Sequence, residues 1–184
     1  MYQAWKPMIF YDDSDKATMD ISDVFKKRNL KNINFKYEDL IGKDLSNSFL
    51  SGVDLSEMDI HNANFSGADL SNANLARTIS FSVNFRGADL RQANLSYAKI
   101  WDSDMYGCDL RESDLRGSDL FNTDLKSSNL ENADLSGAYL KNSDFEGTNL
   151  NGVEFTNTKF DKKTLDSITD TKSKSKLKSQ GIIW

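Results

Sequence analysis

A large apolar side chain recurs at every fifth position between residues 28 and 162, without an insertion or a deletion. The series begins with Leu30, Phe35 and Leu40 and ends with Leu150, Phe155 and Phe160. Of its 27 members, which we call centres, only Ser80 is not bulky and apolar. A helix repeats after about 3.6 residues and a strand after about two, so neither produces this period. The pattern therefore predicts a solenoid whose centres face inward.

The residues around each centre follow rules of their own. Two positions before the centre, the side chain is small throughout from Ala63 to Thr158. Directly before the centre Asp or Asn is usual, and two positions after it Gly and Asn dominate. Asp and Asn side chains hydrogen-bond to nearby backbone groups in turns, and Gly and Asn adopt backbone angles that other residues tolerate poorly. We therefore expect each five-residue unit to form one short side of a coil, followed by a turn.

The unit resembles the pentapeptide repeat, A(D/N)LXX, most plainly at residues 68–72 (ADLSN) and 88–92 (ADLRQ). The resemblance implies an all-β solenoid, a right-handed quadrilateral β-helix in which four repeats make one coil and residues 20 apart stack. The 27 repeats would then make about 6.75 coils and, at a strand spacing of roughly 4.8 Å, a rod about 32 Å long.

Sorting the centres by 20 supports this geometry, because stacked side chains should match in shape. One column contains only leucine, at positions 30, 50, 70, 90, 110, 130 and 150. A second column collects the aromatic centres Phe65, Phe85 and Phe145. A four-sided coil is therefore the expected architecture for residues 28–162.

Both ends of the chain lie outside the repeat and are expected to form short helical caps. Residues 1–27 contain a short apolar run at 7–11, predicted to be extended, and then an amphipathic helix at 15–27. Residues 163–184 predict a helix that ends at Gly181. Four apolar residues in that tail should dock, either on the last coil or in a homodimer with a second copy of the chain: Leu177, Ile182, Ile183 and Trp184. The tail carries a net charge of only +3, so we expect no direct nucleic-acid binding.

Composition narrows the function classes further. A hydrophobic content of 38% is low for a globular core but suits a solenoid in which two positions in five face inward. With a single cysteine, Cys108, and a single histidine, His61, the chain has few candidate catalytic residues. Regular stacking places the carboxylates in lines along the rod and not around one metal ion. We expect no enzyme, no cofactor and no metal. A signal peptide and a membrane helix are absent from the sequence, which predicts a soluble, cytoplasmic protein without a membrane partner.

An aromatic series follows the centres in the column that contains Ser80. Phe81, Trp101 and Phe121 are the residues directly after three successive centres of this column, a position that points outward in the family. We expect their rings to stack into one continuous strip. Ile79 and Tyr139 flank this strip on the same face, and Tyr97 and Tyr106 lie at its neighbouring corners.

An exposed apolar patch usually marks an interface, so these seven residues are interpreted as partner-binding. Two other interpretations stay open. A terminal segment could cover the patch, or a local inversion near Ser80 could turn Ile79 or Phe81 inward. His61, at the end of the series, is interpreted as an ordinary surface residue.

Two functions without chemistry follow from these patterns. The first is a protein-interaction or scaffold module that binds a protein partner through the aromatic face. The second follows from a resemblance to the bacterial pentapeptide proteins of the MfpA and Qnr type, which protect DNA gyrase from quinolones and are thought to imitate duplex DNA. Residues 28–162 hold 14 Lys and Arg against 21 Asp and Glu, a net charge of −7. Duplex DNA about 32 Å long would carry roughly 19 negative charges, so the sequence favours the first function.

Overall fold

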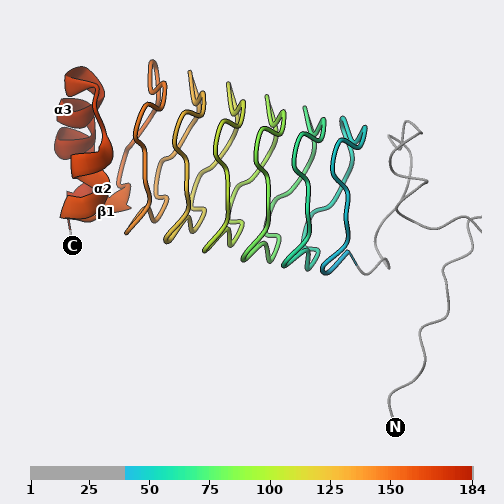
Figure 1. Cartoon of the computed structure of the whole chain (residues 1–184). Coiled ribbons are helices and arrows are strands. Elements are labelled where there is room, and N and C mark those ends of the chain that lie inside the picture. Colours follow the sequence, from blue (N-terminus) through green and yellow to red (C-terminus); the bar gives the residue numbers. More distant parts are fainter. Residues whose placement is uncertain (1–39, 184) are drawn as a thin grey trace, which may run out of the picture.

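The chain winds into stacked coils of 20 residues. The computed structural model describes residues 40–183, and the predicted N-terminal run and helix at 7–27, the first repeats and Trp184 lie outside this range. Parallel β-bridges join residues that are 20 apart in the sequence, from Asp44 and Asn64 to Tyr139 and Lys159. Residues 40–160 thus make six coils that stack along one axis, and the C-terminal helices cover one end of the rod (Figure 1). The predicted stacking distance of 20 residues is confirmed.

The core is a set of columns along the axis of the rod. Every centre from Leu40 to Phe160 is at most 4% exposed, and the small residues two positions before the centres are mostly buried beside them. Ser80 is buried as well, at 1%, and its hydroxyl donates to Oγ1 of Thr78 at 2.7 Å. Because Ser80 keeps its inward position, Ile79 and Phe81 remain on the outer surface. The alternative of a local inversion near Ser80 is therefore wrong.

A turn follows every centre, as the Gly and Asn pattern predicts. Each described residue two positions after a centre, from Gly42 to Asn157, has a positive φ between 53° and 74°. The next N–H donates back to the carbonyl of the centre, as from Ala68 to Phe65 at 3.0 Å. The Asp or Asn before the centre stabilises the turn, because its Oδ1 accepts the N–H two residues on, as Asp69 does from Ser71 at 3.1 Å. The predicted role of these Asp and Asn side chains is confirmed.

Hydroxyl groups in the small inward positions are largely satisfied by the coil itself. Ser113 Oγ donates to the carbonyl of Leu110, and Thr123 Oγ1 donates to that of Ile100, both at 2.7 Å. Cys108 Sγ donates to the carbonyl of Phe85 at 2.9 Å, and burial raises the pKa of its thiol to about 12. Small polar residues therefore fill the core at little cost, since most of their polar atoms keep a partner.

The C-terminal residues close the last coil. Strand β1 (Lys159–Phe160) leads into helices α2 (Lys162–Ser167) and α3 (Thr171–Gln180), and β2 (Ile182–Ile183) returns to pair in parallel with β1. Leu165, Ile168 and Leu177 are buried against the core, whereas Ile182 is 48% exposed. Of the predicted docking residues, Leu177 thus packs on the last coil, whereas the side chain of Ile182 is largely open.

Gly181 ends α3, but for a different reason from the left-handed glycine that often ends a helix. Its N–H donates to the carbonyl of Leu177 at 2.7 Å, while its φ of −98° is accessible to any residue. A Cβ at this position would overlap the ring of Phe160 and lie 2.9 Å from the Leu177 carbonyl. Glycine is needed here because the chain passes so close to the last coil. Within residues 40–183, no helix has the length and apolar character to cross a membrane.

Candidate interaction face

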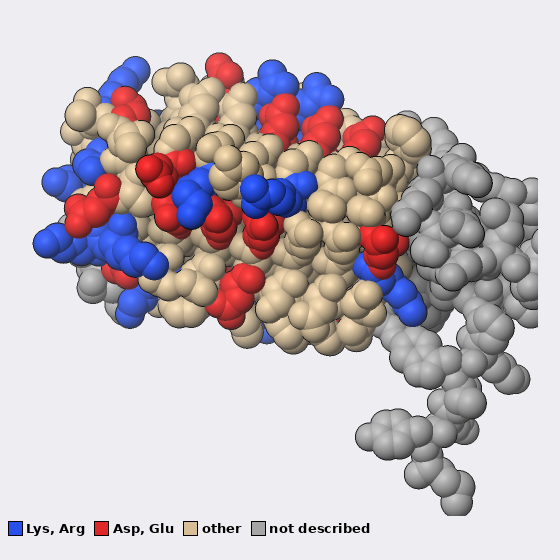
Figure 2. Space-filling view, viewed as in Figure 1, with Lys and Arg blue, Asp and Glu red and all other residues tan. Residues whose placement is uncertain are grey.

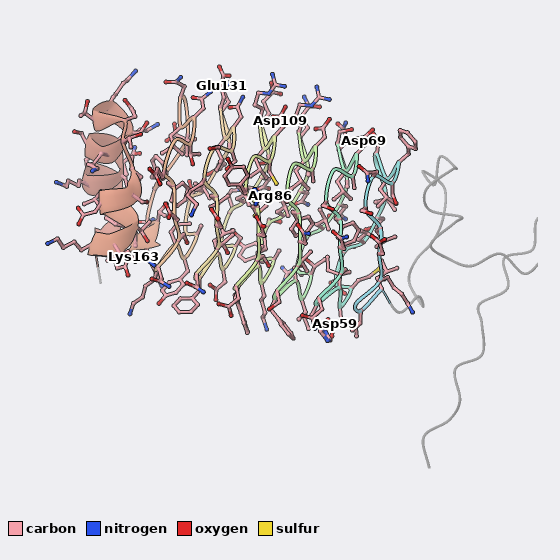
Figure 3. The ribbon with its side chains drawn as sticks, in the orientation of Figure 1. Asp59, Asp69, Arg86, Asp109, Glu131 and Lys163 are labelled. Carbon is pink, nitrogen blue, oxygen red and sulfur yellow. The ribbon has the colours of Figure 1, made fainter. Side chains whose placement is uncertain are left out.

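The predicted partner-binding residues belong mainly to one side of the rod. We call it the Ser80 face, because its centres are Ile60, Ser80, Ile100, Leu120 and Leu140. Asp59, directly before Ile60, marks this face at the lower edge of the rod, opposite Asp69 and Asp109 (Figure 3). Two outward positions per coil contribute to it, one directly before and one directly after each centre, so its side chains form two parallel columns.

The outward rings of the Ser80 face form two groups and not one continuous stack. His61 stacks on Phe81 with ring centroids 4.6 Å apart, and Phe81 stacks on Trp101 at 6.1 Å. Phe121 stacks on Tyr139 at 6.5 Å. Among residues 40–183, no ring contact joins Trp101 to Phe121, so the predicted continuity is wrong at this point. We call these five residues the aromatic strip.

His61 is a member of the strip that the sequence interpretation missed. Its ring is nearly parallel to that of Phe81, with 7° between the planes, and its Nδ1 lies 2.6 Å from Oδ1 of Asp59. The available signal was its position, since His61 directly follows a centre in the same column as Phe81. An imidazole has a flat face, which suits the end of an aromatic stack.

The strip is partly open to solvent. Phe121 is 37% exposed, and Phe81, Trp101 and Tyr139 are half-buried. Trp101 Nε1 is buried, and its interaction with the Asp119 carboxyl lowers the pKa of that group against the larger effect of burial. Uncharged side chains cover much of the lower part of the rod, with single acidic and basic side chains among them, whereas charged side chains gather in rows above (Figure 2).

Two of the predicted tyrosines lie away from the strip and contact arginines. Tyr106 belongs to the neighbouring side, where the guanidinium of Arg86 covers its ring at 4.1 Å. Tyr97 occupies a corner at 58% exposure, with Arg77 at 5.2 Å from its ring. Ile79 does lie on the Ser80 face, where its backbone bridges to the adjacent coils. The structure therefore brings Ile79 to the strip and leaves Tyr97 and Tyr106 beside it.

Family models cover most of the rod. Residues 39–77 match pentapeptide repeats, described as eight copies, and residues 78–155 match a pentapeptide repeat region. The chain belongs to the pentapeptide repeat family. A comparison with curated proteins finds no match.

Solved structures of other pentapeptide repeat proteins are similar to this one at low identity. Rfr23 from the cyanobacterium Cyanothece 51142 is 28% identical over 67% of this chain and 87% of its own, with a TM-score of 0.34. The protein alr5209 from Nostoc Pcc 7120 is 27% identical over 60% and 84%, with a TM-score of 0.40. QnrB1, a plasmid-mediated fluoroquinolone resistance protein, is 17% identical over 66% and 70%, with a TM-score of 0.37.

The other sides of this pentapeptide repeat protein carry internal ion pairs. Asp89, Asp109 and Asp114 each bind the arginine two residues on, with nitrogen to oxygen distances of 2.6 Å. Hydrogen bonds from these arginines hold the pKa of all three carboxyl groups below the ordinary value. Asp119 differs, because Phe121 occupies the place of the arginine and burial raises the pKa of the Asp119 carboxyl. On the Ser80 face, Phe81, Trp101 and Phe121 thus occupy the position that arginines hold beside Asp89, Asp109 and Asp114 on other sides.

Proposed function

We propose that this pentapeptide repeat protein is a non-catalytic interaction module that binds a protein partner through the aromatic strip. The observation that carries the proposal is the partial exposure of stacked rings on successive coils of one face. The equivalent outward position on other sides is mostly polar, and it holds serine at Ser56, Ser71, Ser96 and Ser136. The coil therefore does not need large rings there for its own folding, and aromatic side chains are frequent anchors of protein interfaces.

The C-terminal segment supports this proposal by its position. It could have covered the strip, but α3 and β2 pack on the last coil, and Leu177 is fully buried there. The end of the rod and the Ser80 face are thus separate surfaces. A partner, or a second copy of the chain, can approach the strip while the C-terminal cap stays in place.

Mimicry of DNA for gyrase is the second candidate, and the charge distribution gives it less support. A DNA mimic needs rows of unneutralised negative charge along the rod. On the sides of the rod that hold Asp89, Asp109 and Asp114, arginines lie directly on these carboxylates. Such pairs neutralise much of the negative charge that a DNA-binding protein such as gyrase would recognise.

The test compares Trp101→Ser with the matched control Tyr106→Ser, which removes an aromatic ring from the equivalent position on the neighbouring side. We expect Trp101→Ser to weaken partner capture or self-association, measured by affinity capture and by sedimentation, and Tyr106→Ser to leave both unchanged. Loss of one stacked, half-buried ring should lower the free energy of unfolding by about 1 to 2 kcal/mol, leaving the rod folded. Equal capture by wild type and Trp101→Ser would refute the proposal.

A further inference from the structure

The gap between Trp101 and Phe121 interrupts the aromatic strip at one particular carboxylate. Asp119 precedes the centre Leu120, and its backbone bridges to Lys99 on one side and Tyr139 on the other. Its Oδ1 accepts the backbone N–H of Phe121 at 3.1 Å, so the carboxylate is held at the turn that carries Phe121. An acidic group therefore lies on the Ser80 face where the two groups of rings separate.

Asp119 makes no close ion pair in the part of the chain that the structure describes. Within residues 40–183, no Lys, Arg or His nitrogen lies within 4.0 Å of its carboxylate. Lys99, which is stacked on Asp119 in the adjacent coil, has its Nζ 6.0 Å from the centroid of the Trp101 ring, and its charge lowers the pKa of the Asp119 carboxyl less than burial raises it. Burial opposes the charge of Asp119, and that burial raises the pKa of the carboxyl. A partly desolvated carboxylate that makes no close ion pair is stabilised by a positive charge placed beside it.

On the neighbouring side of the rod, an arginine of the chain itself binds a carboxylate in the same position. There Asp104 accepts the N–H of Tyr106 at 2.9 Å, which is the arrangement of Asp119 and Phe121. Arg86, one coil earlier, donates from Nη1 to Asp104 Oδ2 at 3.3 Å and covers the Tyr106 ring at 4.1 Å. One guanidinium thus satisfies the carboxylate and the ring together.

On the Ser80 face, the position that corresponds to Arg86 is Trp101. The carboxylate and the ring of this arrangement are present in Asp119 and Phe121, and the guanidinium is replaced by an indole. Among the described residues, no cation lies over the Phe121 ring. The chain has therefore kept the carboxylate and the ring, and it holds a neutral indole where the neighbouring side holds a guanidinium.

We propose that Asp119 and Phe121, together with the adjacent edge of Trp101, accept an arginine side chain of the partner protein, in the way that Asp104 and Tyr106 accept Arg86 within the chain. This inference rests on the proposed function and names the chemistry of its partner. Arginine is the better occupant than lysine, because a planar guanidinium can stack on a ring and hydrogen-bond to a carboxylate at the same time. A basic residue at the centre of the interface would also explain why an acidic group interrupts an apolar strip.

The test uses a short probe in place of the unidentified partner. Acetyl-Gly-Arg-Gly amide is titrated into the full chain labelled with ¹⁵N, and the Phe121 amide and the Trp101 indole N–H are followed by NMR. Both signals should shift in a saturable way. The same peptide with uncharged citrulline should shift them at least five-fold less, and the lysine peptide should fall between the two.

Two matched variants complete the test. Asp119→Asn keeps the oxygen that accepts the Phe121 N–H, as Asn129 and Asn149 do in the same position, so it should fold and lose the arginine response. Asp134→Asn removes one charge at the same position on another side and should keep it. An unchanged response in Asp119→Asn, or equal responses to citrulline and arginine, would overturn the inference, and an equal response to lysine would overturn the choice of guanidinium.

The outcomes also separate this inference from the proposed function. If Trp101→Ser weakens partner capture while the peptide response does not depend on Asp119, the strip is an interface and the arginine site is wrong. If the peptide response depends on Asp119 while Trp101→Ser leaves partner capture unchanged, the arginine site is right and the strip is not the main interface.

Discussion

Truncation of a leucine in the middle of the rod tests the packing on which every coil depends. Leu110 is completely buried, and it belongs to the leucine column between Leu90 and Leu130. Its N–H donates to the carbonyl of Asn129 at 2.7 Å, and its own carbonyl accepts from both the N–H and the hydroxyl of Ser113. Because these bonds hold the backbone on both sides, the walls of a cavity at this position cannot easily move inward.

The expected cost of Leu110→Ala follows from this rigidity. Replacing a buried leucine by alanine costs about 2 to 5 kcal/mol, and the upper part of this range applies where the site cannot collapse. We therefore expect the free energy of unfolding to fall by about 3 to 5 kcal/mol. Urea unfolding followed by far-UV circular dichroism measures the change from the midpoint and the slope.

Phe121→Ala is the matched control, because it removes a larger side chain from the outside of the same rod. Phe121 is 37% exposed, and its loss should cost about 1 kcal/mol or less. A Leu110→Ala variant that unfolds at the wild-type midpoint would refute the packing argument. So would a Phe121→Ala variant that is destabilised as much as Leu110→Ala.

Three further predictions use the same unfolding assay or a simple reactivity assay. Gly181→Ala should loosen the C-terminal cap, because the new Cβ overlaps the last coil, and amide exchange in α3 should become faster. Gly107→Ala has open space around it, so it should lower the free energy of unfolding by only about 1 kcal/mol, the cost of a positive φ. Cys108 should resist alkylation at pH 8 until the rod unfolds, and rapid labelling of the folded protein would contradict its burial. Asp89→Asn should lower the free energy of unfolding by up to about 1 kcal/mol at pH 7. Because Arg91 lowers the pKa of Asp89 in the folded protein below 3.8, this difference should be present above pH 3.8 and should vanish as the pH falls through the lowered pKa.

The fold of the repeat could be predicted from the sequence because each position in the unit has one structural task. Bulky centres such as Leu70 must be buried, Asp69 must hold the turn, and Asn72 must accept a positive φ. These requirements are local and recur without a slip in register. A sequence with a constant period therefore determines the coil, and the outward columns follow from it.

Side-chain contacts between coils could not be predicted in the same way. The separation of Trp101 from Phe121 depends on rotamers, since both residues occupy the expected outward positions. The contact of Arg86 with Asp104 joins positions 18 apart, so it crosses from one coil to the next and leaves no mark on the five-residue pattern. Gly181 was recognised as a helix end, but its true constraint is the ring of Phe160, which only the folded cap brings near.

Because residues 20 apart stack, insertions of 20 and of five residues would change the rod in different ways. An insertion of 20 residues would add one coil, lengthen the rod by about 4.8 Å and leave every surface column aligned. An insertion of five residues would preserve the core pattern just as well, yet it would turn everything beyond it by a quarter of a revolution. If the five residues were inserted between Trp101 and Phe121, the two groups of rings would lie on different sides of the rod. A partner that contacts both groups therefore tolerates added coils only outside the segment that it binds.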